Sequence, residues 1–158
     1  MWQRIQSVFL GIVILSLVLG LFFYPVWTSS VQGTDYKLFA LHFLVKQGDA
    51  AGGPLSTSTY IPYCLTAILM AAAMTIAILE FRRFDNRVLQ VKLGTLNSLI
   101  LAGAMICEVL FSNPLVKTYG GTYEPALYLT FVAIASNWLA VRFIRRDEKL
   151  VKDSDRLR

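Results

Sequence analysis

Residues 5–24 read IQSVFLGIVILSLVLGLFFY, twenty consecutive residues without a formal charge. A helix rises about 1.5 Å per residue, so about 20 apolar residues are needed to cross a hydrocarbon core about 30 Å thick. A cleaved secretory signal has a shorter apolar run and a small-residue cleavage site, whereas this stretch is followed by Pro25, Val26 and Trp27. The stretch therefore predicts a retained membrane-spanning helix.

Three further stretches have the same character. Residues 62–79 and 93–111 supply 18 and 19 residues, and residues 125–141 supply 17, which Arg142 extends by reaching toward the head groups. Glu108 is their only acidic residue, and Pro114 is expected just beyond the end of the third helix. Together the stretches predict an all-α membrane protein, a single antiparallel bundle of four transmembrane helices at about 5–24, 62–79, 93–111 and 125–144.

Composition and charge support this class and indicate an orientation. Of the 158 residues, 56% are hydrophobic and 16% are charged, whereas soluble domains average about a quarter charged. The net charge is +5, and twelve of the fifteen basic residues lie before the first stretch, between the second and third, or in the tail. Because basic connections stay cytoplasmic, we expect both termini on the cytoplasmic side. This distribution explains the excess positive charge without nucleic acid as a partner.

The first connection, residues 25–61, is too long to be a plain loop. Residues 26–31 and 36–41 are typical of two short strands around a turn at residues 32–35, and residues 50–54 are typical of a flexible linker. The sequence therefore predicts a small extracytoplasmic β-hairpin. At the other end of the chain, residues 145–158 are expected to form a cytoplasmic tail that continues the fourth helix.

Polar residues lie on one face of the third and fourth predicted helices. Asn97 and Asn137 fall at nearly the same depth of an antiparallel pair, so a hydrogen bond between them is expected to join the helices. Glu108 falls level with Tyr128 and, with Thr130, forms a candidate intramembrane polar site. Two interpretations of Glu108 stay open: a carboxyl group that reaches the outer interface or a tyrosine hydroxyl, and part of an ion or proton pathway.

The sequence lacks the patterns of known catalytic and metal sites. His42 is the only histidine, which excludes a bis-histidine haem site or a three-ligand zinc site. Cys64 and Cys107 are far from the C-x-x-C spacing of thiol oxidases. We expect two inert buried thiols, although both lie near the outer ends of their helices and a disulfide stays open. The sequence therefore predicts no enzyme, no cofactor and no metal.

Both ends of the chain resemble a known family. The start, MWQRIQS at residues 1–7, runs directly into the first apolar stretch, and the end reads DEKLVKDSDRLR at residues 147–158. These patterns are similar to the ends of the Bacteroidota family known as domain of unknown function 4293, and the resemblance extends over the whole chain. It implies a small inner-membrane protein with four spans, a long first outer loop and no assigned activity.

These observations favour a structural or accessory protein. It is expected to contact the lipid bilayer and to dock to another membrane protein, or to copies of itself, through its tail, its inner loop or both. The tail interleaves charges of both signs, which suits a solvated helix or a specific partner surface. The alternative function is a small transporter or channel subunit that uses Asn97, Glu108, Thr130 and Asn137. The candidate lipid or partner contacts are Arg145, Arg146, Lys149, Lys152, Arg156 and Arg158.

Overall fold

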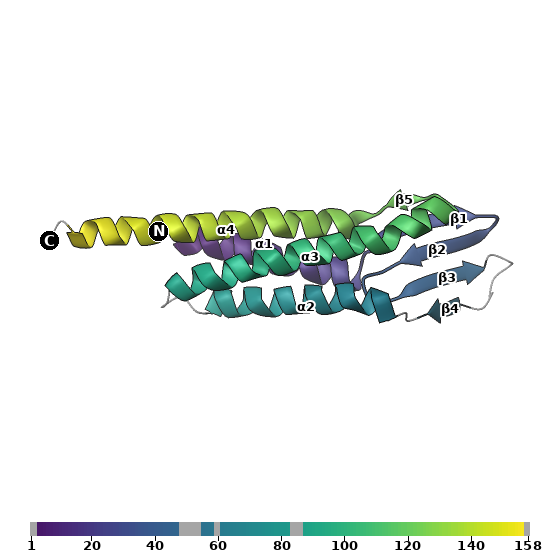
Figure 1. Cartoon of the computed structure of the whole chain (residues 1–158), viewed down its shortest axis with the longest axis horizontal. Coiled ribbons are helices and arrows are strands. Elements are labelled where there is room, and N and C mark those ends of the chain that lie inside the picture. The colour runs from purple at the N-terminus through teal and green to yellow at the C-terminus, as the bar shows by residue number, and fades with distance from the viewer. Residues whose placement is uncertain (1–2, 48–54, 59–60, 83–86, 157–158) are drawn as a thin grey trace.

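The computed structural model describes residues 3–47, 55–58, 61–82 and 87–156. Within these residues four long helices run side by side, and a sheet of short strands extends from one end of the bundle (Figure 1). The prediction of four helices is confirmed, and each contains a stretch long and apolar enough to cross a membrane. The helices are α1 (Gln3–Phe22), α2 (Ile61–Arg82), α3 (Arg87–Tyr119) and α4 (Pro125–Arg156).

The third helix is longer than predicted and does not end before its proline. Pro114 lies inside α3, so its expected place beyond the helix end was wrong. A proline there removes one backbone hydrogen bond, but the helix continues for five more residues, and the Thr118 hydroxyl bonds the Pro114 carbonyl at 2.9 Å. The helix ends at Tyr119 and is followed by Gly120, whose φ of 67° is the left-handed conformation that glycine adopts most easily after a helix C-terminus.

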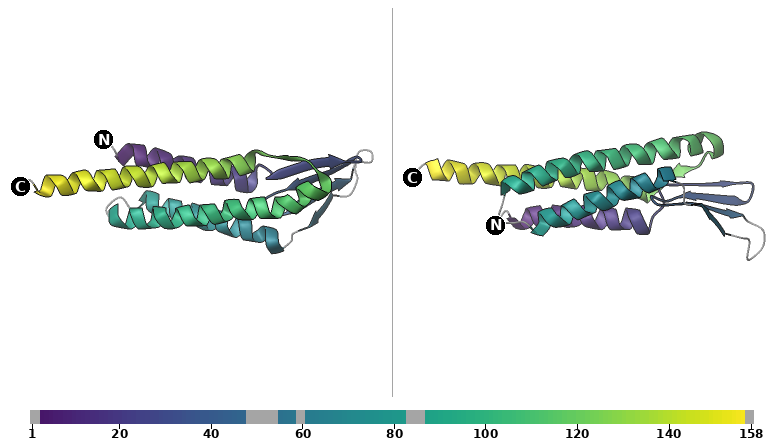
Figure 2. Two further views of the ribbon diagram at one scale, coloured as in Figure 1. Left: turned by 45° about the horizontal axis from the view of Figure 1, so that its top comes forward. Right: turned by 60° about the horizontal axis from the view of Figure 1, so that its bottom comes forward.

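The fourth helix projects beyond the others. At the end opposite the sheet, α4 continues past the start of α1 and past the neighbouring ends of α2 and α3 (Figures 1 and 2). The predicted helical continuation of the tail is therefore present as far as Arg156. Arg87 supports this part of α4 from the start of α3, because its Nη1 lies 3.5 Å from Asp147 Oδ2 and 3.4 Å from the Asp147 carbonyl oxygen.

The sheet is larger than the predicted hairpin. Strands β1 (Trp27–Val31) and β2 (Thr34–Leu38) form a hairpin at that place, but its turn is shorter than the predicted residues 32–35, and β2 begins and ends earlier than the predicted residues 36–41. Gln32 and Gly33 have positive φ values of 50° and 78°, as a two-residue type I′ turn requires. The predicted linker at residues 50–54 lies outside the described residues. Three further antiparallel strands complete the order β4-β3-β2-β1-β5: β3 (Phe43–Gln47), β4 (Leu55–Ser58) and β5 (Thr122–Tyr123).

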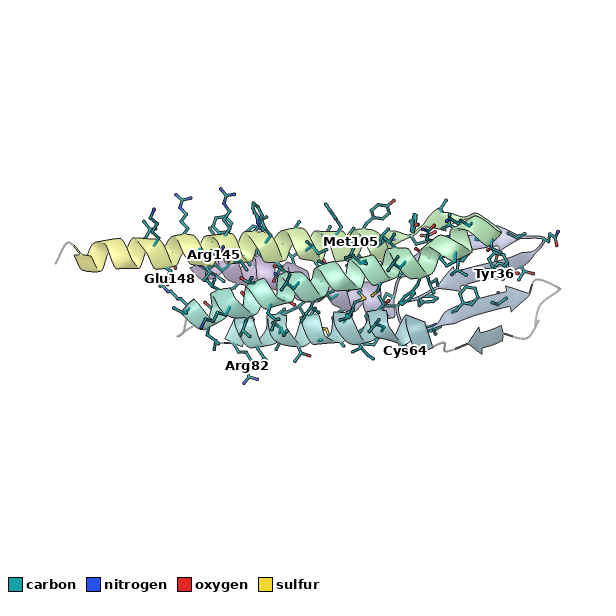
Figure 3. All side chains as sticks on the ribbon, viewed as in Figure 1. Tyr36, Cys64, Arg82, Met105, Arg145 and Glu148 are labelled. Atoms are coloured by element: carbon teal, nitrogen blue, oxygen red, sulfur yellow. The ribbon has the colours of Figure 1, made fainter. Side chains whose placement is uncertain are left out.

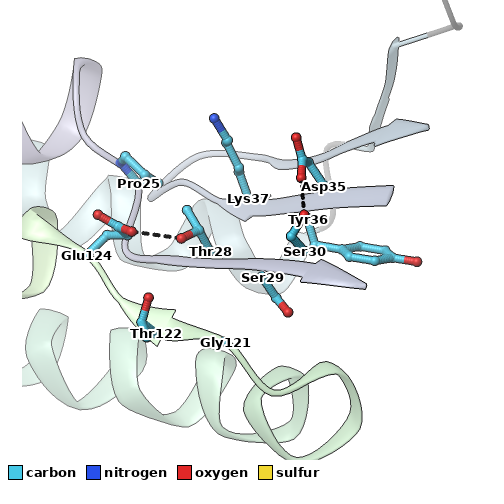
Figure 4. A pocket seen from close by; sticks show the side chains of 10 residues that line it. All are labelled: Pro25, Thr28, Ser29, Ser30, Asp35, Tyr36, Lys37, Gly121, Thr122 and Glu124. Atoms are coloured by element: carbon cyan, nitrogen blue, oxygen red, sulfur yellow. Dashed lines mark hydrogen bonds between the residues drawn. The ribbon is translucent and has the colours of Figure 1, made fainter. Parts of the chain in front are cut away.

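The sheet is tied to the helices at a junction formed by β1 and the segment between α3 and α4. The buried Trp27 donates from Nε1 to the Gly120 carbonyl oxygen at 3.1 Å, and Ser29 Oγ donates to the Tyr119 carbonyl oxygen at 2.6 Å. On the other side of β1, Thr28 Oγ1 donates to Glu124 Oε1 at 2.7 Å (Figure 4). Backbone pairing of β1 with β5 completes the junction, which therefore fixes the sheet over this end of the bundle.

Small side chains dominate the contacts inside the bundle. Alanines of α2, α3 and α4 are fully buried, and they allow helix backbones to approach closely where larger side chains would hold them apart. Leucine, valine and methionine fill the space left between the helices. The buried apolar cluster consists of Val13, Leu17, Ala40, Met70, Ala73, Ala77, Leu101, Ala104 and Ala133.

Candidate functional site

Buried polar side chains lie along the contact of α3 with α4 and α2. The buried residues of α3 recur every three or four positions and so form one face of that helix; the polar ones stand on this face, and α4 presents the matching face. All are at most 3% exposed, which is costly for groups that carry hydrogen-bonding atoms. We call this set the polar seam; it consists of Glu80, Gln90, Asn97, Glu108, Ser112, Thr130 and Asn137.

Two asparagines join α3 to α4 in the half of the bundle that lies away from the sheet. Asn97 Nδ2 donates to Asn137 Oδ1 at 3.2 Å, so the structure joins the two residues paired by depth in the sequence. Asn137 Nδ2 donates in turn to the Gly94 carbonyl oxygen at 2.9 Å and to Ser98 Oγ at 2.8 Å. Asn137 therefore uses both ends of its amide, whereas Asn97 Oδ1 is buried without a partner among the described residues.

Glu108 lies at the end of the bundle that adjoins the sheet. Thr130 Oγ1 donates to Glu108 Oε1 at 2.9 Å, so these two candidate residues meet. The third, Tyr128, is 63% exposed and does not join them, because residues two apart on a helix point to nearly opposite sides. Nor does Glu108 reach an outer interface: it is 2% exposed beside a cavity of about 10 Å³ bordered by Phe39, Ala40 and Thr66. Its Oε2 has no partner within the described residues, and the cavity is about the size of one water.

Glu80 is the buried carboxyl group that the sequence did not reveal. It is 0% exposed, both its carboxyl oxygens lack a partner among the described residues, and Gln90 Nε2 bonds only its backbone oxygen, at 3.1 Å. In the sequence it stands between an apolar stretch and Phe81-Arg82, which is typical of a solvated helix end. The one feature of the sequence that could have indicated the burial of Glu80 is Gly94, at the same depth on the next helix. A residue without a side chain leaves room for a buried neighbour.

The candidate tail contacts lie apart from the polar seam. Three of them are exposed on α4 toward the end of the bundle opposite the sheet, where Figure 3 labels Arg145: Arg145, Arg146 and Lys149. The side chains of Lys152 and Arg156, and all of Arg158, lie outside the described part of the chain. The tail and the polar seam are therefore two separate candidates for function.

The chemistry available in the polar seam is that of carboxyl, amide and hydroxyl groups. Searched over the described ranges, the chain contains no cluster of three or more histidine, cysteine, aspartate or glutamate residues that could hold a metal. Cys64 and Cys107 are free thiols, and they are half-buried rather than buried as the sequence suggested. The polar seam can join helices through hydrogen bonds, or it can bind a small cation or proton at its carboxyl groups.

The asparagine pair allows a direct test of the first role. We expect Asn97→Leu and Asn137→Leu each to lower stability by about 0.5–2 kcal/mol, with the larger loss for Asn137 because it makes three of the bonds. The double variant should lose less than the sum of the single variants, since both remove the same bond. Thermal unfolding in mild detergent measures all three losses, and additive losses would show that the pair does not share a stabilising bond.

The chain matches the model of a known protein family. A family model described as "Domain of unknown function (DUF4293)" matches residues 2–157, which is nearly the whole chain. The resemblance seen at the two ends of the sequence is therefore confirmed by a match that also includes the helices and the sheet. A search of curated proteins gives no match.

Proposed function

The chain belongs to the DUF4293 family, whose function is unknown, and we propose that it is a non-catalytic accessory subunit of the inner membrane that docks to another membrane component through the projecting end of α4. The projection of α4 beyond the bundle is the observation that carries this proposal. The proposal also requires that the bundle spans the membrane and that the projecting end is cytoplasmic.

The surface of the bundle supports a membrane location. Large apolar side chains point outward on several helices, among them Val8 at 61%, Phe22 at 65% and Leu99 at 69% exposure. A soluble protein rarely exposes apolar surface this widely, whereas lipid tails solvate it without cost. The exposed arginines Arg82 and Arg145 lie at the end opposite the sheet, so the positive-inside rule favours a cytoplasmic location for that end.

The projecting part of α4 has the features of a protein contact. Asp147 and Glu148 stand between Arg146 and Lys149 at the point where α4 passes the start of α3, and Leu150 is 54% exposed next to them. A simple attraction to anionic lipid would be stronger without the acidic residues, because each basic residue near the surface contributes only about 1 kcal/mol. Mixed charges on a rigid helix instead favour one complementary partner and disfavour others. The ion pair of Arg87 with Asp147 holds the start of this segment in place.

Deletion of residues 149–158 tests the docking proposal. The shortened chain keeps Arg142, Arg145 and Arg146, so it should insert and fold with a stability within about 0.5 kcal/mol of the full chain, while a co-purifying partner is lost. Extraction in mild detergent followed by identification of bound proteins measures this. The control, Lys37→Gln with Lys46→Gln, removes positive charge at the sheet end and should keep the partner. A partner retained by the shortened chain, or no partner with the full chain, contradicts the proposal.

Cysteine labelling tests the proposed orientation. In a chain whose Cys64 and Cys107 are replaced by serine, a membrane-impermeant thiol reagent should label Lys117→Cys on intact cells and should not label Lys149→Cys. Both positions are exposed, so access depends on the side of the membrane and not on burial. The Lys149→Cys variant should become labelled once the membrane is permeabilised. Labelling of Lys149→Cys on intact cells would reverse the orientation.

A transporter or channel subunit is the second candidate, and the two buried carboxyl groups favour it. Glu80 and Glu108 lie on opposite halves of the bundle: Gly94, beside Glu80, is fourteen residues from Glu108 on α3, or about 21 Å. Between them the polar seam is interrupted by the fully buried Leu101 and Ala133, so polar side chains do not form a continuous path from one carboxyl group to the other. Docking is therefore preferred. Ion flux into liposomes that contain only this chain, lost in Glu108→Gln, would favour the second candidate.

A further inference from the structure

A cleft opens between α3 and α4, and neither buried carboxyl group of the polar seam lines it. Its volume is about 420 Å³. It lies where the predicted apolar stretch of α4 ends, at residue 141, and so at the depth expected for lipid head groups. The cleft is lined by Thr95, Ser98, Trp138, Val141, Arg142 and Arg145.

Two guanidinium groups are held in this cleft by neutral neighbours. Arg145 Nη2 donates to Thr95 Oγ1 at 3.2 Å, and Arg142 Cζ lies 5.3 Å from the ring centre of Trp138. No carboxylate lines the cleft, and neither arginine forms an ion pair within the described part of the chain. A guanidinium carries five N–H donors, so most of the donors of both side chains have no anionic partner among the described residues.

The hydroxyl groups that line the cleft hold the arginines and the helices rather than a ligand. Thr95 Oγ1 donates to the Val91 carbonyl oxygen and Ser98 Oγ donates to the Gly94 carbonyl oxygen, at 2.7 and 3.0 Å. Thr95 therefore positions Arg145, and the donors left for a ligand belong to the two arginines. Planar forks of N–H donors match the oxygens of a phosphate group.

We propose that this cleft binds the phosphate of an anionic phospholipid headgroup. A basic pocket between helices at the cytoplasmic end of a bundle is the arrangement that such headgroups recognise. Apolar side chains also line the cleft, Val141 and the 55% exposed Trp138, and an acyl chain would lie along Trp138. A free phosphate ion would gain nothing from these neighbours. The site depends on the membrane location proposed above and is independent of the docking role of the α4 end.

Lipid retention by the purified full chain tests the site. By native mass spectrometry, the protein should retain phosphatidylglycerol in preference to phosphatidylcholine with the same acyl chains. Arg142→Gln with Arg145→Gln should lower phosphatidylglycerol retention on the order of tenfold or more, since two basic contacts are lost. The matched control, Arg82→Gln with Lys149→Gln, removes the same charge from exposed positions outside the cleft and should retain the lipid as the unchanged protein does.

Three outcomes would overturn the proposal. Equal retention of the two lipids by the unchanged protein excludes a headgroup site, and this comparison decides the matter even if the double variant fails to fold. Equal loss in the cleft variant and in the control shows that overall charge, and not the cleft, attracts the lipid. Displacement of phosphatidylglycerol by inorganic phosphate, at the same concentration as the lipid, shows that a free anion is the ligand.

Discussion

Replacement of Gly121 by alanine should loosen the sheet from the helices and lower stability by about 2–5 kcal/mol. Gly121 has a φ of 91°, in a region that side chains with a Cβ rarely adopt. A Cβ built there would overlap the Thr28 carbonyl oxygen and lie 2.7 Å from Ser29 Cβ and 3.0 Å from Trp27 Nε1. The backbone of Thr28 cannot withdraw easily, because β1 is paired with β2 on one side and with β5 on the other.

The neighbouring glycine provides the matched control. Gly120 also has a positive φ, 67°, but a Cβ there would meet no atom within 4 Å. Gly120→Ala should therefore cost only the backbone strain, about 1–2 kcal/mol, and the difference between the two variants isolates the steric overlap at the junction. Thermal unfolding in detergent gives both values. Equal losses in the two variants would show that the junction does not pack as closely as the structure indicates.

The helices could be predicted from the sequence, and most of the sheet could not. Length and absence of charge are local properties, so residues 5–24 alone specify a helix that can cross a membrane. The β1–β2 hairpin is also local, because its turn residues lie between the strands. In contrast, Trp27 pairs with Tyr123 in β5, 96 positions away, and no local pattern in the two residues of β5 indicates a strand.

Some residues of the polar seam could likewise be placed from the sequence, and others could not. Asn97 and Asn137 could be paired because helical periodicity gives the face and distance from the connecting loop gives the depth. Tyr128 was matched to Glu108 by depth alone, and it failed because its direction around α4 is different. Glu80 could not be placed from its own neighbours in the sequence. Its burial depends on α3 and α4, which come close only because Gly94 has no side chain.

Gly94→Ala should therefore have the second large effect, a loss of about 1–3 kcal/mol. A Cβ on Gly94 would overlap Val141 Cγ2 and lie 2.8 Å from Glu80 Oε1 and 3.2 Å from Glu80 Oε2. The new methyl group must push α4 or the buried carboxyl group aside, and movement of α4 would stretch the 2.9 Å bond from Asn137 to the Gly94 carbonyl oxygen. This cost exceeds the gain of about 1 kcal/mol that alanine brings to a helix interior.

Gly103→Ala on the same helix separates the two contributions. The nearest atom to a Cβ at Gly103 is Leu69 Cδ1 at 3.9 Å, an ordinary contact, so this variant should be neutral or gain up to about 1 kcal/mol. Adding Val141→Ala to Gly94→Ala removes the overlapping methyl group, and the pair should cost less than the sum of its parts. Thermal unfolding in detergent compares the unchanged protein with the three single variants and the double variant. If Gly94→Ala is as stable as Gly103→Ala, then α3 and α4 do not meet at Gly94 as closely as the burial of Glu80 requires.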